Sequence, residues 1–221
     1  MRIEEEKMDG EAWGNLWKEA KAAQHQKGYQ QAYRSMEAAA KDTEGEMLFY
    51  QSKVCEGVFH RISSGTTRDG LEVFGKMEKG YLLSVDSNWD MYGDGYLSGH
   101  YFSEGALREQ LEKAYPGLVF TEEPVENQIN MYKRDKVGHI LFLTVGNKTI
   151  SGEEFRQLLE LPSSNFTMQA ADGKIRFLCK GQGHGLGLSQ YGGNVLAKEG
   201  KSYKEILRYY FPECGVQKKD S

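Results

Sequence analysis

Apolar and polar residues alternate along this chain with two periods, one typical of helices and one typical of strands. Residues 11–40 follow the helical period and are rich in Ala, Glu, Lys and Gln without proline, so we expect helix here with a break near residue 28. A strand is expected over residues 46–50. Residues 54–62 are rich in β-branched and aromatic side chains, and they are predicted to form the partner strand of a hairpin.

The middle of the chain alternates short strands with a capped helix. Residues 81–85 are predicted to form a strand, and Ser103 is predicted to cap a helix that runs to about residue 115. Two further strands are expected over residues 129–133 and 139–145.

The C-terminal third carries two Ser-x-x-Glu capping boxes, which begin at Ser151 and Ser202, and each predicted helix is stopped by a proline. Residues 166–170 and 175–180 flank an Asp-Gly pair that is typical of a tight hairpin turn. This succession of hairpins and short helices, without repeated βαβ units, predicts a single mixed α+β domain.

A chain of 221 residues is long enough for one domain with a buried core. We divide it into a helical N-terminal segment over residues 1–28, a main domain over residues 29–215 and a polar tail over residues 216–221. No internal repeat and no low-complexity linker interrupts the main domain.

Charge and composition exclude several classes of protein. The net charge is −4 and the lysines and arginines are scattered along the chain, so nucleic acid is a poor partner. The longest apolar run, about residues 140–145, is far shorter than the ~18 residues that a membrane span needs, and residues 1–10 are acidic and polar, unlike an export signal. The three cysteines form no CxxC pair, so no disulfide framework is indicated and they are expected to be small buried residues.

The most distinctive stretch is Gly181-Gln-Gly-His-Gly-Leu-Gly-Leu-Ser-Gln-Tyr-Gly-Gly193, which we call the Gly loop. Its alternating glycines permit positive φ angles and a close approach of a ligand or a second segment to the main chain. A phosphate loop fits poorly, because Leu188-Ser189 stands where a Walker loop needs Lys-Ser/Thr and the third glycine of a dinucleotide loop is missing. A sugar-binding surface remains, as does a tight turn in which His184 is a satisfied core histidine.

Part of this stretch, Gly183-His-Gly-Leu-Gly-Leu-Ser-Gln-Tyr-Gly192, closely resembles the C-terminal signature of the stage II sporulation protein D family, which comprises bacterial peptidoglycan lytic transglycosylases. Other stretches also fit the family's pattern, namely residues 197–200, 202–212, 38–48 through 59–65, and 81–90. The resemblance covers roughly residues 29–212.

The resemblance implies binding of peptidoglycan glycan strands and their lytic transglycosylase-type cleavage in cell-wall remodelling during sporulation. In that reaction the 6-hydroxyl of the substrate attacks and an anhydro sugar forms, so one carboxyl group of raised pKa can serve as acid and then as base. The family carries this glutamate in an Ala-Glu-x-Pro segment ahead of a helix, and neither stands in this sequence. The catalytic residue is therefore unassigned, with Glu11 and Glu19 as the carboxylates to consider next.

The rest of the family's site carries over only where residues match. The substrate-binding candidates are His60, Ser63, Ser64, His184, Ser189, Gln190 and Tyr191. Their hydroxyls, amide and aromatic face suit N-acetylated sugars. We expect the loop over residues 63–70 to lie beside the Gly loop, with the two histidines close together.

Cofactor, partners and location are also implied by the resemblance. Some family members bind zinc through a histidine and two cysteines, but Ser63 and Ser64 occupy that region here, so no metal is expected, although Cys55 and His60 could in principle share one. The expected partners are peptidoglycan glycan strands and other cell-wall proteins, and the expected location is extracytoplasmic.

Three interpretations account for the unassigned acid: an incomplete chain, a binding domain whose enzyme part lies elsewhere, or a relative that has lost activity. An enzyme and a non-catalytic glycan-binding protein both predict affinity for glycan, and only the enzyme predicts anhydro-sugar products. A structural protein of a cell-wall complex is the third class.

Overall fold

A computed structural model describes residues 27–218 of the chain. Its elements are helices, short strands and single-turn helices in small separate sheets, so the predicted mixed α+β class is confirmed. The contacts divide the chain into two compact units, one over residues 56–215 and one that contains residues 27–55 and 216–218. Most of the predicted N-terminal segment 1–28, including Glu11 and Glu19, lies outside the described residues.

The smaller unit contains one helix and a three-stranded sheet. Helix α2 (Lys27–Asp42) precedes strand β1 (Glu46–Tyr50), and the sheet has the order β11-β1-β2, with β2 over Lys53–Val54 and β11 over Gly215–Lys218. The turn between β1 and β2 consists of two residues whose φ angles are 49° and 62°, as a tight right-twisted hairpin requires.

The prediction of one strand over residues 54–62 is wrong. Strand β2 ends at Val54, and strand β3 (Phe59–His60) pairs in parallel with β10 (Leu188–Ser189). The intervening backbone bonds elsewhere, since the Glu56 carbonyl accepts from the Tyr81 hydroxyl and the Val58 carbonyl accepts from the Leu188 N–H. A parallel partner 129 positions away in the chain leaves no local signal, so sequence periodicity could not predict it.

The predicted strand over residues 81–85 is also wrong. The segment begins in a turn and continues as irregular backbone, which bonds to preceding residues through Gly70 N–H to Leu82 O and Thr67 N–H to Val85 O. Helix α3 (Gly70–Phe74) and the single-turn helices η1 (Met77–Lys79) and η2 (Asn88–Tyr92) occupy this region.

The remaining strands of the larger unit form two three-stranded antiparallel sheets. One has the order β4-β9-β8, with β4 over Leu97–Phe102, β8 over Phe166–Ala171 and β9 over Lys174–Lys180. The other has the order β5-β6-β7, with β5 over Ile129–Arg134, β6 over Ile140–Val145 and β7 over Lys148–Ser151. The predicted strands of β5, β6, β8 and β9 are confirmed, whereas β4 and β7 were not predicted.

The helices of the larger unit begin where the sequence places their caps. Ser103 caps α4 (Glu104–Ala114), and complete capping boxes open α5 (Gly152–Leu158) and α7 (Tyr203–Tyr210). Ser189 caps α6 (Gln190–Lys198), and η3 (Val125–Gln128) precedes β5. No described helix has both the length and the apolar composition needed to cross a membrane.

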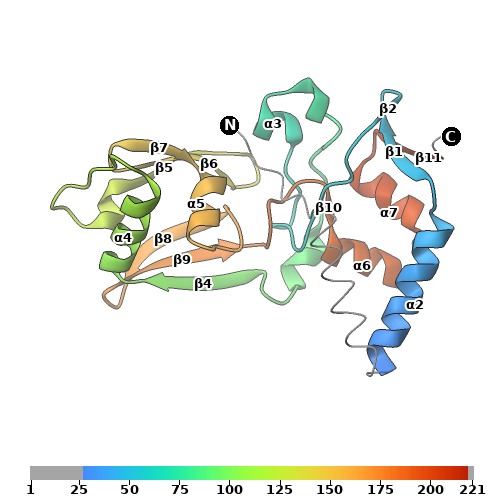
Figure 1. Ribbon diagram of the computed structural model, residues 1–221, viewed down its shortest axis with the longest axis horizontal. Coiled ribbons are helices and arrows are strands. Elements are labelled where there is room, and N and C mark those ends of the chain that lie inside the picture. Colours follow the sequence, from blue (N-terminus) through green and yellow to red (C-terminus); the bar gives the residue numbers. More distant parts are fainter. Residues whose placement is uncertain (1–26, 219–221) are drawn as a thin grey trace. The chain divides into compact units, whose positions relative to one another are not determined.

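The core of the larger unit lies around α5, which Figure 1 shows between the two three-stranded sheets. Phe155 of this helix is fully buried and its ring lies 5.5 Å from that of Phe166 and 5.7 Å from that of Phe177. Cys179 is buried as expected, whereas Cys55 and Cys214 are only partly buried. This core fixes the end of β9, which leads directly into the Gly loop.

We expect Phe155→Ala to lower the free energy of unfolding by about 3–5 kcal/mol, because the removed ring leaves a cavity between two other rings. Denaturant unfolding would measure the change. Tyr92→Ala, at an aromatic side chain that is 82% exposed, is the control and should cost less than about 1 kcal/mol. Equal losses in the two variants would contradict this placement of the core.

Candidate functional site

The Gly loop lies against the loop over residues 61–70, as predicted. Besides the β3–β10 pairing, Ile62 and Gln182 exchange two backbone hydrogen bonds of 3.1 and 2.7 Å. The Arg68 N–H donates to the Gly185 carbonyl at 2.8 Å. The two segments are therefore held backbone to backbone along their length.

The glycines of the Gly loop make this contact sterically feasible. A Cβ on Gly183, whose φ is 99°, would lie 2.9 Å from the His60 Cβ. A Cβ on Gly185, whose φ is 77°, would lie 3.0 Å from the His139 ring nitrogen Nε2 and from Arg68 Cδ. Any larger residue would push the Gly loop away from His60 and His139. Glycine is therefore needed at these two positions for close packing as well as for the positive φ angle.

His60 and His184 are in direct contact, with ring centroids 5.9 Å apart in an edge-to-face arrangement. His60 is buried and its Nδ1 lies 3.0 Å from the Leu186 carbonyl. His184 is half-buried and its Nδ1 accepts the Leu186 N–H at 3.1 Å, so a neutral His184 carries its proton on Nε2. The predicted proximity of the two histidines is confirmed, with His60 the more deeply buried.

A third histidine, His139, belongs to the same cluster and was missed in the sequence, where it stands at the start of a predicted strand. It is buried, and its Nδ1 lies 3.0 Å from the Ser164 hydroxyl. Its backbone N–H donates to Asp135, whose other oxygen accepts from Arg68 at 2.6 Å. Arg68 also donates to the His184 carbonyl at 3.1 Å, so one buried ion pair joins all these segments.

Asp90 of η2 is a second residue that the sequence did not single out. It is fully buried, and it accepts the Ser63 N–H at 2.7 Å and the Ser189 hydroxyl at 2.8 Å. The Ser189 hydroxyl in turn accepts the Gly192 N–H and caps α6. Ser63 and Ser189 thus have structural roles in joining the loops, and contact of either with a substrate stays a prediction.

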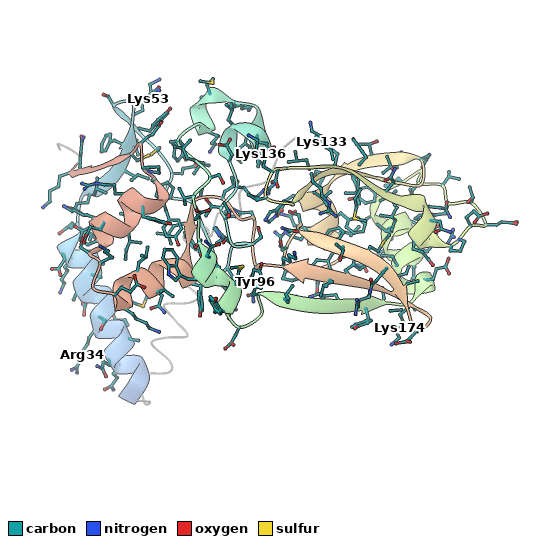
Figure 2. All side chains as sticks on the ribbon, turned by 180° about the vertical axis from the view of Figure 1, so that it is seen from behind. Arg34, Lys53, Tyr96, Lys133, Lys136 and Lys174 are labelled. Carbon is teal, nitrogen blue, oxygen red and sulfur yellow. The ribbon has the colours of Figure 1, made fainter. Side chains whose placement is uncertain are left out.

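The other candidates reach solvent. Gln190 is exposed, and Ser64, His184 and Tyr191 are partly exposed. The Tyr191 ring packs over Gly93, where a Cβ would lie 3.2 Å from the ring. The Ser64 carbonyl accepts from the Tyr96 hydroxyl at 3.3 Å, and Figure 2 labels Tyr96 just ahead of β4. Four of the seven predicted residues can therefore meet a ligand without unfolding the loops.

Burial keeps the histidine cluster uncharged. Burial, together with the nearby His184 and Arg68, lowers the pKa of His60 to about 3, although the contact with the Leu186 carbonyl opposes the shift. The pKa of His139 lies well below its ordinary value for the same reason, with Arg68 adding to the effect. The pKa of His184 is lowered chiefly by burial, although Glu153 opposes the shift. At neutral pH these rings are therefore hydrogen-bonding groups and not cations.

Three buried polar atoms of this region have no hydrogen-bond partner among the described residues, namely His60 Nε2, His139 Nε2 and Glu153 Oε2. The other oxygen of Glu153 accepts from the Arg156 guanidinium at 2.8 Å. Among the buried carboxylates of Asp90, Asp135 and Glu153, only that of Glu153 keeps an unpartnered oxygen, because Asp90 and Asp135 use both of theirs.

The described residues do not supply the set of ligands that the zinc site expected from the family resemblance would need. Within residues 27–218, no three His, Cys, Asp or Glu side chains are arranged to hold a metal ion. His60 presents one unpartnered nitrogen, and serines occupy the neighbouring positions 63 and 64. No chemical step is assigned to a metal here.

Asp90→Asn should lower the free energy of unfolding by about 2 kcal/mol, since one of two buried donors loses its acceptor. Denaturant unfolding would measure it. Asp86→Asn, which alters a 3.5 Å contact to Thr66 at the surface, is the matched control and should cost less than about 0.5 kcal/mol. If both variants behave alike, Asp90 does not join the loops as described.

Lowered histidine pKa values predict a loss of stability in acid. Between the ordinary value of 6.5 and the folded value of about 3 for His60, the unfolded chain binds more protons, so the free energy of unfolding falls as pH falls. From pH 7 to pH 5 each such histidine should cost about 2 kcal/mol.

The test compares denaturant unfolding at the two pH values. His60→Gln should reduce the loss between pH 7 and pH 5 by roughly one histidine's share, whatever its stability at pH 7. His100→Gln, at a histidine of β4 outside the cluster, is the control. An unchanged loss in His60→Gln would show that His60 does not stay neutral in the fold.

Comparison with known proteins agrees with the motifs. The chain is 30% identical over 193 residues to stage II sporulation protein D of Bacillus amyloliquefaciens, which covers 87% of this chain and 54% of that protein. It is 27% identical over 194 residues to the protein of the same name from Bacillus subtilis, with the same shares covered. This chain thus spans about half the length of these relatives.

A shorter match, 32% identical over 88 residues, links 40% of the chain to 12% of the amidase enhancer of Bacillus subtilis. No family model matches the chain. The two sporulation proteins, however, match 87% of the chain, and their name is that of the family whose signature the Gly loop resembles. The resemblance of this chain to the stage II sporulation protein D family is therefore confirmed.

Proposed function

We propose that this chain binds peptidoglycan glycan strands during sporulation and takes part in their lytic transglycosylase-type cleavage. The observation that supports it most directly is the Gly loop held against residues 61–70, with His184, Gln190 and Tyr191 reaching solvent beside this junction. The similarity to stage II sporulation protein D adds the biological setting. Since glycan strands lie outside the cytoplasm, we also propose an extracytoplasmic location.

The exposed groups match the chemistry of an N-acetylated sugar. The Gln190 amide can donate to and accept from an acetamido group, and the Tyr191 ring offers an apolar face to the flatter side of a pyranose. A neutral His184 adds a ring that can hydrogen-bond to hydroxyls without attracting anions. The glycines on either side of His184 pack against His60, Arg68 and His139, which positions the imidazole beside this junction.

The acid of the reaction remains unassigned among the described residues. Glu153 has an unpartnered oxygen close to the histidines, but its other oxygen is held by Arg156, so protonating it would weaken a largely buried ion pair. Proton transfer to a leaving oxygen contributes about 10²–10⁴ in rate. We therefore propose that these residues bind glycan and release little or no anhydro sugar by themselves.

A second candidate function is a non-catalytic cell-wall protein that binds glycan or supports another enzyme. The shorter match favours it, because the name amidase enhancer describes an effect on a different activity. The two candidates share the glycan-binding surface and differ in whether an anhydro product forms.

The 221-residue chain should bind denuded glycan strands, and Tyr191→Ala or Gln190→Ala should each raise the dissociation constant about three- to tenfold through lost stacking or hydrogen bonding. Isothermal titration with purified glycan oligomers would measure binding. Mass spectrometry of the same mixtures should find little or no anhydro product.

Gln157→Ala, at an exposed glutamine of α5, is the matched control and should leave affinity unchanged. Absence of binding by the wild-type chain would refute glycan recognition. Robust release of anhydro sugar would refute the proposed inactivity, and Glu153→Gln would then test whether Glu153 is the acid.

A further inference from the structure

The outward face of the β4-β9-β8 sheet is a second surface with the chemistry of a polymer-binding site. Strand alternation turns every second residue away from the core. The outward residues are Leu97, Gly99 and Tyr101 of β4, Lys174, Arg176, Leu178 and Lys180 of β9, and Thr167, Gln169 and Ala171 of β8. All of them are exposed or partly exposed.

This face concentrates positive charge in a protein whose net charge is −4. Three cations, Lys174, Arg176 and Lys180, lie along the central strand, and none of the outward residues of the three strands is acidic. Six residue steps of a strand make a row about 20 Å long. Figure 2 shows Lys174 at the hairpin end of this row, remote from Tyr96 at the other end of β4. The row was not predicted from the sequence, because the surrounding residues come from three strands that only the sheet brings together.

The centre of the face is flat and partly aromatic. A Cβ on Gly99 would lie 3.4–3.8 Å from ring atoms and the hydroxyl of Tyr101, so the Tyr101 ring lies across this glycine with 55% of the residue exposed. Tyr101 is paired across strands with Arg176, and Arg176 is paired with Gln169 on its other side. With its amide oxygen turned toward Arg176, Gln169 accepts from the guanidinium, which holds that cation on the side of the face toward β8.

We propose that this outward face, which we call the cationic face, binds a segment of glycan strand beyond the Gly loop. The occupant is a glycan whose muramic acid residues carry free lactyl carboxylates, as strands without stem peptides do. A flat ring beside a row of cations complements a sugar face beside a repeated carboxylate. The cationic face also leads into the Gly loop, because Lys180, which pairs with Leu97, directly precedes Gly181.

This inference rests on the proposed function, and it adds a substrate preference for anionic over neutral glycan. The test measures dissociation constants of the full chain for denuded glycan oligomers and for chitin oligomers of equal length, which have the acetamido groups but no carboxylates. The variant Lys174→Glu/Lys180→Glu should weaken denuded-glycan binding about tenfold at low salt, ~1.4 kcal/mol, and flatten its salt dependence. Its chitin binding should stay as in the wild type.

Tyr101→Ala should weaken binding of both polymers by about threefold to tenfold. Lys113→Glu/Lys198→Glu changes the charge equally at exposed positions of α4 and α6 and is the matched control, with no expected effect. Wild-type binding that depends on Tyr191 but not on Lys174 and Lys180 would overturn this inference and leave the proposed function intact.

Two other results would also overturn the inference. Equal wild-type affinity for chitin and denuded glycan would show that the carboxylates are not recognised. Binding of single-stranded DNA as tight as that of glycan, and equally sensitive to the charge reversal, would show that the cationic face attracts polyanions without selection for sugar. Absence of any glycan binding by the wild type would refute both the inference and the function on which it rests.

Discussion

The buried ion pair between Arg68 and Asp135 joins the segments on which the candidate site depends. Both side chains are almost wholly inaccessible, and removal of two charges from water is costly unless their remaining hydrogen-bonding groups are satisfied. Here Asp135 also accepts the His139 N–H, and Arg68 also donates to the His184 carbonyl. The same pair therefore fixes the Gly loop, the loop over residues 61–70 and the turn between β5 and β6.

The ion pair also shapes the electrostatics around it. A buried arginine next to three buried or half-buried imidazoles disfavours a second positive charge, which together with burial keeps the rings neutral. Positive charge lies instead on the outward face of β9, where the side chains of Lys174, Arg176 and Lys180 are hydrated. The larger unit thus separates a neutral hydrogen-bonding junction from a cationic surface.

Local signals in the sequence predicted much of this architecture and failed where contacts are distant. The capping boxes at Ser151 and Ser202 are complete within four residues, so they could be read directly. Strand β4 was missed because Leu97-Ser-Gly-His-Tyr-Phe102 has a glycine and two polar residues where an apolar strand is expected. The bonds of Asp90 to Ser63 and Ser189 span 27 and 99 positions, and no local pattern marks such partners.

The pairing of Leu97 with Lys180 means that the chain leaves and re-enters the site region at one hydrogen-bonded point, since the Gly181 N–H also donates to the Tyr96 carbonyl. Residues 97–180 are thus a closed excursion whose ends are already adjacent. Loop-closure entropy grows only slowly with length, so the exposed turns within this excursion can be lengthened at modest cost. The turn that carries Asp135 and His139 must be kept, because it reaches back to the Gly loop, and so must the connection between α5 and β8, whose Pro162 carbonyl accepts the Gly183 N–H. Changes of length are consequently expected at the turns far from the Gly loop and not at these two contacts.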